Sequence, residues 1–375
     1  AFDVATRIGA SPLMVMQNLY IVYGRPYSFG RPSSGGSKAA YPCKSYGQGR
    51  INPAYFYGVF DPNDMRRDVS ITMTGSNGKG VEKLIPFVPN SKAEGGGLTL
   101  NKWDENRQAN PWVAAQRKSG INGPYMRMSE VYLGYAEVCA ALGDVVTGKQ
   151  YLKTVRERSF PQGLANTDAF IASFGNDLVR AIIEERGFEY AGEGDRRWTL
   201  IRSGYLPEDI KRIKDMTKAM MDGLATKGYY EFENGNIISA YIWTKLVDAK
   251  TIYGHRLTAQ CPTDKVNDPV LYPGWRGQKD NWEEMGLNYG SSTPATNLAI
   301  KGLFEIVSEE EAASLESQGY TKVNWGIDLV DNRDEYDKYL FWDYDYVSAP
   351  IYLWPFTPNV MAAGGFTNGY GFKQE

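Results

Sequence analysis

Residues 125–159 read YMRMSEVYLGYAEVCAALGDVVTGKQYLKTVRERS, and residues 177–204 read DLVRAIIEERGFEYAGEGDRRWTLIRSG. Gly143 is typical of a helix end, and Thr147 with Gln150 forms a capping-box pattern for the start of a following helix. The first stretch therefore predicts an antiparallel helical hairpin with a very short connection. Its first helix carries an apolar face, because apolar residues recur there at helical spacing: Met128, Val131, Tyr135, Val138 and Leu142.

Charged residues crowd the second stretch, beside an aliphatic helix. One interpretation is a network of ion pairs that joins the helices by charge-assisted hydrogen bonds. In that network we expect Glu185, Glu189 and Glu193 to pair with arginines of the same stretch, or with Arg127 across the helical hairpin. The other reads Glu184, Glu185 and Glu189 as the carboxylates of a glycoside hydrolase. We favour the network, because catalytic carboxylates need unequal environments whereas carboxylates crowded by arginines are all held ionised. The charged residues of the stretch are Glu185, Arg186, Glu189, Glu193, Arg196, Arg197 and Arg202.

The composition is that of a globular protein that is rich in aromatic residues. The 375 residues can bury one large core or two, and 42% of them are hydrophobic. A net charge of −3 and the lack of any run of Lys or Arg argue against a nucleic-acid partner. The chain holds 26 Tyr, 9 Trp and 40 Gly. This blend indicates either a loop-rich surface with aromatic faces, as in carbohydrate binders, or an ordinary aromatic core.

Cysteine and histidine usage excludes several kinds of site. Cys43, Cys139 and Cys261 are far apart and form no CxxC pair, which argues against zinc and against a disulfide framework. Cys139 falls on the predicted first helix, so we expect it to be a small core residue. His255 is the single histidine, and no GxSxG motif accompanies it, which argues against a Ser-His-Asp triad and a transition-metal enzyme.

Asp328, Asp331 and Asp334 crowd one short segment. Carboxylate oxygens at such spacing can hold calcium, although the EF-hand order and its central glycine are absent. The alternative is a solvated acidic loop. No other cofactor is predicted, and no apolar run approaches the roughly 18 residues of a membrane-spanning helix.

The predicted organisation is a single, mainly α domain over residues 1–375, with tetratricopeptide-like helical hairpins and a large loop-rich ligand-binding region. Residues 25–124 are rich in Gly, Pro, Ser and Asn and are predicted to be irregular, with one strand-like run at 69–74 before a turn at 76–78. Residues 125–225 form the helical core and 226–300 an aromatic insertion. Residues 301–375 hold one helix, Ser308 to Gln318, and a closing tail.

Two groups of aromatic residues lie in these irregular regions, where no apolar period runs. Flat aromatic rings can stack on the C–H faces of a sugar while polar neighbours hold its hydroxyls. The alternative is that the rings pin irregular loops onto the body of the protein. The predicted ligand-binding residues are Tyr41, Tyr46, Arg50, Tyr55, Tyr57 and Trp103 in the first group, and Tyr272, Trp275 and Trp282 in the second.

Several motifs in the same order resemble those of the SusD/RagB family. Arg127 with SEVYL at 129–133 and Ala136-Glu137 is similar to a helix of that family, and Gly143-Asp144 and VRER at 155–158 follow it. The second charged stretch matches a further family segment, although Thr199 replaces the usual Asp. DPNDMRRD at 61–68, YLWP at 352–355 and NGY at 368–370 resemble three more elements. Thr357 and Asn368-Gly369 depart from the family pattern.

The resemblance implies an α-helical superhelix with a loop-rich ligand-binding face and no catalysis. Members are surface lipoproteins of Bacteroidetes that bind nutrients for a TonB-dependent outer-membrane transporter of the SusC type. The resemblance therefore implies an outward-facing, outer-membrane location and a lipid anchor upstream of Ala1. The resemblance further implies that the sequence does not contain the N-terminal half of the family fold, with most tetratricopeptide helices. A glycan is the expected ligand, with a peptide as the alternative; a helical adaptor and a glycoside hydrolase using Glu184, Glu185 or Glu189 are the competing functions.

Overall fold

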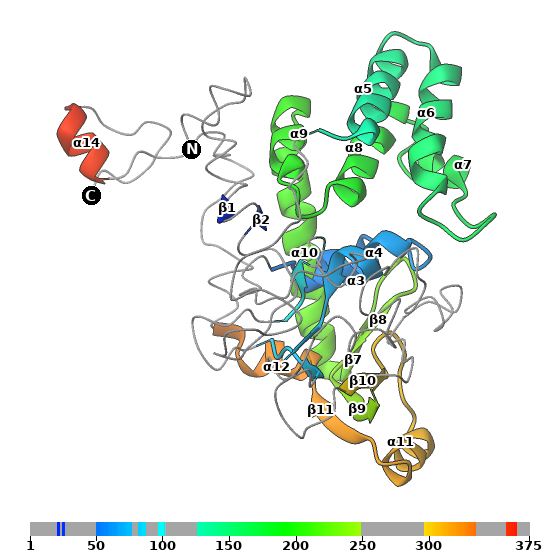
Figure 1. The fold of residues 1–375 in the computed structure, drawn as a ribbon, viewed down its shortest axis with the longest axis vertical. Helices are drawn as coiled ribbons and strands as arrows, with labels where there is room; N and C mark the ends of the chain where they lie inside the picture. The colour runs from blue at the N-terminus through cyan, green and yellow to red at the C-terminus, as the bar shows by residue number, and fades with distance from the viewer. Residues whose placement is uncertain are drawn as a thin grey trace, which may run out of the picture.

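The structure is a computed structural model that describes residues 21–22, 25–26, 50–76, 82–87, 97–100, 102, 126–248, 296–334 and 358–365. Helices account for far more of these residues than strands do, so the predicted mainly α fold is confirmed. Figure 1 shows a group of helices at one end, the long helix α10 running through the middle, and short strands toward the other end.

The predicted helical hairpin is present as α5 (Met128–Ala141) and α6 (Val145–Glu157). Gly143, at φ +88°, follows α5 and supplies the left-handed conformation that turns the chain. The cap of α6 that was predicted at Thr147 is wrong by one turn. Asp144 is the cap, and its carboxylate accepts a hydrogen bond of 3.1 Å from the backbone N–H of Thr147, which already lies inside the first turn.

Four more helices follow the hairpin: α7 (Thr167–Ala172), α8 (Leu178–Glu189), α9 (Asp195–Ser203) and α10 (Leu206–Lys227). Helix α8 packs against both α5 and α6, and nearly all its residues are buried. Their shared core includes Leu133, Leu152, Val155 and Ile182. An aliphatic sequence rich in Glu and Arg thus forms an interior helix.

The apolar stripe of α5 does not face this core. Met128, Val131, Tyr135, Val138 and Leu142 are all at least half exposed, whereas the opposite side of the helix is buried. That buried side carries Ser129, Leu133, Ala136 and Cys139. The expectation that Cys139 is a core residue is confirmed. The spacing of the large residues predicts the helix, but it does not reveal which side the core covers.

Two short helices interrupt the region predicted to be irregular: α3 (Pro53–Gly58) and α4 (Met65–Ser70). The side chain of Asn52 caps α3 by accepting a 2.8 Å hydrogen bond from the N–H of Ala54, and Pro53 takes the first helical position. Asp64 caps α4 in the same way through the N–H of Arg66, at 3.0 Å. Both helices are too short for a helical periodicity of apolar residues to be visible in the sequence.

The described residues before α5 also form short antiparallel strand pairs. They are β1 (Ile21–Val22) with β2 (Arg25–Pro26), β3 (Ile71–Thr72) with β6 (Thr99–Leu100), and β4 (Thr74–Ser76) with β5 (Glu82–Leu84). The predicted strand run at 69–74 thus contains the end of α4, then β3 and the start of β4. The turn predicted at 76–78 follows β4, and its residues after Ser76 lie outside the described part of the chain.

The C-terminal part adds a hairpin and a sheet. Strand β7 (Tyr229–Glu231) pairs with β8 (Ile237–Ser239). Strands β10 (Thr296–Lys301), β9 (Tyr241–Asp248) and β11 (Thr321–Asn324) form an antiparallel sheet in that order. Helix α11 (Glu309–Ser317), capped by Ser308, confirms the helix predicted at 308–318. Helices α12 (Gly326–Asp331) and α14 (Pro358–Gly364) complete the described elements.

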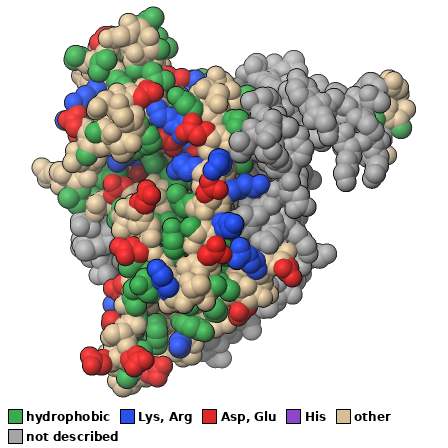
Figure 2. All heavy atoms as spheres, turned by 180° about the vertical axis from the view of Figure 1, so that it is seen from behind, with side chains coloured by type: hydrophobic (Ala, Val, Ile, Leu, Met, Phe, Trp, Pro, Cys, Tyr) green, Lys and Arg blue, Asp and Glu red, His purple; other side chains and the backbone are tan. Residues whose placement is uncertain are grey.

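The larger core lies where α3, α10, the sheet and α12 meet, and includes Phe56, Tyr57, Met221, Trp325 and Leu329. Figure 2 shows positive and negative side chains interspersed over one face of the molecule, with no broad area of a single sign. None of the described helices has both the length and the apolar character that crossing a membrane requires.

Candidate functional site

Most of the predicted ligand-binding aromatics fall outside the described part of the chain. These are Tyr41, Tyr46, Trp103, Tyr272, Trp275 and Trp282. Arg50, Tyr55 and Tyr57 are described. Arg50 is exposed and forms a single antiparallel bridge with Thr99 just before α3, so it lies at the surface as a ligand-binding residue would.

Tyr55 and Tyr57 were predicted to lie in an irregular loop, and this is wrong, because both belong to helix α3. Tyr57 has no exposed surface: its ring stacks on Phe232, and its hydroxyl accepts a 2.9 Å hydrogen bond from the indole N–H of Trp325. Tyr55 is partly buried, and burial raises the pKa of its hydroxyl to about 12. The Asn52–Pro53 start of α3 turns Tyr57 into the core, so it pins this helix to the body of the protein.

Tyr57→Phe is expected to lower the free energy of unfolding by about 1–3 kcal/mol, because the buried indole N–H of Trp325 loses its acceptor. Denaturant unfolding of the variant and the wild type gives this difference. Tyr241→Phe is the control, since Tyr241 lies at 36% exposure on β9. An equal loss in both variants, or none in either, would contradict the role given to Tyr57.

The three aspartates of the proposed calcium site lie on and just after α12. Burial raises the pKa of Asp328, which opposes the ionised form that a calcium ligand needs. In the part of the chain that the structure describes, no group of three or more His, Cys, Asp or Glu side chains is placed to hold a metal ion. Asp328, Asp331 and Asp334 therefore do not form the cluster that their spacing suggested.

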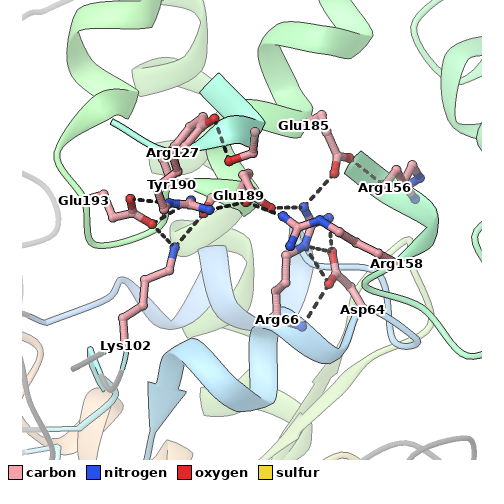
Figure 3. A network of polar contacts seen from close by, with 11 residues as sticks. Asp64, Arg66, Lys102, Arg127, Arg156, Arg158, Glu185, Glu189, Tyr190 and Glu193 are labelled. Atoms are coloured by element: carbon pink, nitrogen blue, oxygen red, sulfur yellow. Dashed lines mark hydrogen bonds and ion pairs between the residues drawn. The ribbon is translucent and has the colours of Figure 1, made fainter. Parts of the chain in front are cut away.

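An ion-pair network is centred on Glu189 at the end of α8 (Figure 3). The carboxylate of Glu189 forms ion pairs with Arg127 Nη1 at 2.6 Å and with Arg66 Nη1 at 3.1 Å. It also forms an ion pair with Arg158. The Glu189 side chain is buried, while its arginines are exposed to different degrees, from 11% for Arg66 to 53% for Arg158. Three cationic groups therefore converge on one buried anion.

The network continues one helical turn back along α8, at Glu185. Arg66 Nη1 lies 2.6 Å from Glu185 Oε1, and Arg156 Nη1 donates to Glu185 Oε2 at 2.9 Å. Asp64 holds Arg66 from the other side, at 2.7 Å between Oδ2 and Nη2. The α4 cap, the end of α6 and helix α8 are thereby joined through buried charge.

At its other end the network holds Lys102 and Arg127, which enclose residues 103–126 in the sequence. Lys102 Nζ lies 2.5 Å from both Glu193 Oε1 and the backbone carbonyl of Glu189. Arg127 donates to both carboxylate oxygens of Glu193, at 3.0 and 2.8 Å. Burial lowers the pKa of Lys102, and the neighbouring Glu193 opposes that shift. Glu193 thus anchors Lys102 and Arg127 at one point.

The electrostatics of Glu189 suit a permanently ionised structural group. Burial favours its neutral form, but Arg66, Arg158 and Arg127 outweigh burial and lower its pKa to about 2. Glu184 and Glu185 are equally buried, and Glu184 accepts from Arg196 at 2.8 Å. A general acid needs a raised pKa and access to a sugar. The arrangement of all three carboxylates therefore favours the network over glycoside hydrolysis.

Sequence reasoning predicted this network in part. The pairing of Arg127 with Glu189 and Glu193 across the helices is confirmed. Other arginines of the stretch pair elsewhere: Arg186 with Glu130 and Asp195, Arg196 with Glu184 and Asp209, and Arg202 with Glu137. The prediction missed Arg66, Arg156, Arg158 and Lys102. Arg66 lies in the DPNDMRRD motif and Arg156 and Arg158 in VRER, so the resemblance had already pointed to three of these residues.

Residues 6–355 match the sequence profile of the SusD family. The chain belongs to the SusD family. The resemblance drawn from the motifs is therefore confirmed, and the network described above is built from several of those motif residues.

Individual SusD-family relatives align over parts of the chain. The SusD-like protein P25 of Formosa agariphila is 28% identical over 160 residues, which cover 42% of this chain and 26% of that protein. A SusD homolog from Bacteroides thetaiotaomicron is 22% identical, with a TM-score of 0.31 over 42% of this chain and 34% of its own. A SusD superfamily protein from Bacteroides vulgatus is 18% identical, with a TM-score of 0.27 over 43% and 33%. The chain thus spans about a quarter to a third of the length of these relatives.

Proposed function

We propose that the chain is part of a non-catalytic nutrient-binding protein that delivers a glycan to a SusC-like, TonB-dependent outer-membrane transporter. The observation that carries the proposal is membership of the SusD family over residues 6–355. The burial of Glu184, Glu185 and Glu189 in ion pairs supports the absence of catalysis, because none of them has the open, unequal environment of a glycosidase acid. A peptide is the alternative ligand.

The proposal includes a place in the cell. The protein is expected at the cell surface of a Bacteroidetes bacterium, held in the outer membrane by a lipid anchor that lies upstream of Ala1. Pull-down from native membranes tests this directly. Recovery of a TonB-dependent barrel with the protein supports the proposal, and recovery from the cytosolic fraction without a barrel contradicts it.

The ligand-binding surface is proposed to include aromatic residues that precede and follow Lys102 in the sequence. Trp103 is adjacent in the sequence to Lys102, whose Nζ lies 2.5 Å from Glu193 Oε1. Tyr41, Tyr46 and exposed Arg50 belong to the same predicted group. Tyr272, Trp275 and Trp282 form the second candidate surface.

Alanine at Tyr46 or Trp103 is expected to weaken binding by about 0.5–1.5 kcal/mol beyond the lost contact area, because a stacked ring is removed. A glycan and peptide array first identifies a ligand, and calorimetry with that ligand then compares the variants. Trp275→Ala tests the second surface, and Tyr241→Ala on β9 is the control.

Normal binding by both first-group variants together with a loss of binding in Trp275→Ala would move the site to the second surface. Binding of peptides alone would replace the glycan proposal, and hydrolysis of a glycan would contradict the non-catalytic assignment.

A further inference from the structure

The three-stranded sheet of β10, β9 and β11 lies at the same end of the molecule as helix α11 (Figure 1). Side chains alternate between the two faces of the sheet along each strand. One face belongs to the larger core, to which it contributes Ile242 and Leu298. The other face carries Trp243, which packs with Leu315 of α11. Helix α11 covers only part of this second face, because Tyr241 on the same face is 36% exposed.

Two lysines flank Trp243 on this second face. Lys301 of β10 and Lys322 of β11 are both register partners of Trp243, so the three side chains form a row across the sheet, the lysine row. Neighbouring strands lie about 4.8 Å apart, which places the two lysine Cα atoms about 10 Å from each other. Both lysines are exposed. Their flexible stems allow both ammonium groups to reach a single group bound above the row.

The chain does not neutralise either lysine of the row. Lys322 Nζ lies 4.1 Å from the centroid of the Tyr241 ring, so its contact there is a cation–π contact. Among the residues that the structure describes, no Asp or Glu forms an ion pair with Lys301 or Lys322. Lys245 on the same face differs, because its Nζ donates to the backbone carbonyl of Gln318 at 2.7 Å. The row therefore holds two positive charges without a counter-charge from the described part of the chain.

The lysine row offers hydrogen-bond donors and no acceptor. Ammonium groups and the indole N–H can only donate. The indole N–H of Trp243 is buried, and it donates to no atom of the described residues. A buried donor without a partner is rare in proteins. The charge and the hydrogen-bonding capacity of the row therefore both favour an anionic group with free oxygen atoms.

We propose that the lysine row binds the carboxylate or sulfate group of an acidic glycan. The inference rests on the proposed glycan-binding function, and it adds a ligand class and a surface that includes none of the aromatic residues proposed above. Lys301 and Lys322 pair with the anionic group, and the exposed part of the Tyr241 ring lies beside them for contact with the sugar. Because Tyr241 supports Lys322, Tyr241→Ala serves as a control for the aromatic loops only when their ligand is uncharged.

Calorimetry with oligogalacturonate and with its methyl ester tests the lysine row, because the ester keeps the sugar rings and removes their charge. The double variant Lys301→Gln/Lys322→Gln is compared with the wild type. Lys218→Gln/Lys227→Gln is the matched control, since both of these lysines are exposed on α10 and the change in net charge is the same. A sulfated oligosaccharide, measured in parallel, distinguishes sulfate from carboxylate as the anionic group.

The lysine variant is expected to bind the anionic oligosaccharide about tenfold more weakly than the wild type, because two exposed ion pairs are lost. The control variant is expected to match the wild type, and the wild type is expected to bind the methyl ester far more weakly than the acid. Wild-type affinity for the acid is also expected to fall as salt rises from about 0.1 M to about 1 M, where the Debye length shrinks from about 10 Å to about 3 Å. An unchanged melting temperature of the lysine variant establishes that it is folded.

Other outcomes overturn the inference. Equal binding of the anionic oligosaccharide by the lysine variant and the wild type would do so, as would equal binding of the ester and the acid by the wild type. Binding of inorganic sulfate as tight as that of the oligosaccharides would reduce the row to a site for simple anions.

The same experiment separates this inference from the proposed function. Loss of acid binding in Tyr46→Ala or Trp103→Ala, with no loss in the lysine variant, would assign the acidic glycan to the aromatic loops and leave the proposed function standing. Binding of neutral glycans alone would likewise overturn only the lysine row. Failure of every glycan to bind, neutral or acidic, would contradict the proposed function as well.

Discussion

Glu189→Gln is expected to lower the free energy of unfolding by about 3 kcal/mol, the lower end of the 3–5 kcal/mol that the loss of one partner of a buried ion pair costs. The substitution keeps the shape of the side chain but removes the charge that Arg66, Arg127 and Arg158 share. The lower end applies because Arg158 is 53% exposed and Arg127 26%, so water can compensate them in part. Denaturant unfolding of the variant and the wild type measures the difference.

Glu316→Gln is the matched control for this prediction. Glu316 is an exposed residue near the end of α11, so the same chemical change there is expected to alter stability by no more than about 0.5 kcal/mol. The folded fraction of Glu189→Gln is expected to keep its ligand affinity, since Glu189 has a structural role. Unchanged stability combined with the loss of a hydrolytic activity would reject the structural role and restore the glycosidase hypothesis.

The helical part of the fold could be predicted because its signals are local. The hairpin of α5 and α6 follows from apolar spacing and from Gly143, and α11 follows from Ser308 with acidic residues in the first turn. The side of α5 that meets the core could not be predicted, because α5 is apolar on two sides and spacing alone does not distinguish them. Helix α3 is too short for periodicity, although Asn52 followed by Pro53 is a start signal that would have revealed it.

Local sequence signals predict only part of the ion-pair network. Arg127 and Glu189 were paired correctly because Arg127 starts the predicted hairpin and Glu189 lies in the charged stretch that was expected to pair across it. Arg66 lies 123 positions from Glu189, and nothing in spacing or propensity brings the two together. The prediction that Tyr57 lies in a ligand-binding loop failed for a related reason. Its hydrogen-bond partner Trp325 is 268 positions away, so the burial of Tyr57 depends on tertiary contacts and not on the Gly- and Pro-rich composition around it.

Acid is expected to remove the same stabilisation that Glu189→Gln removes. In the folded protein the pKa of Glu189 is about 2, against 4.5 for an unperturbed glutamate, because three arginines outweigh the effect of burial. A carboxyl group with a lowered folded pKa contributes its full stabilisation above its unfolded pKa, and this contribution is lost as pH falls through the folded value. The window is therefore between about pH 5 and pH 2, and the contribution is about 3 kcal/mol at 1.36 kcal/mol per pKa unit.

Unfolding free energies of the wild type and Glu189→Gln, measured at intervals from pH 7 to pH 3, isolate this contribution. Other acidic groups also titrate in this range: burial favours the neutral form of Asp209, but Arg196 and Arg212 lower its pKa. Such groups affect both proteins alike, so they cancel in the difference between the two curves. The difference is expected to be constant above about pH 5 and to shrink steadily below it, because protonation makes the wild-type side chain as uncharged as glutamine. A difference that stays constant down to pH 3, or that grows in acid, would show that Glu189 is not the buried anion that holds α4, α5 and α6 to α8.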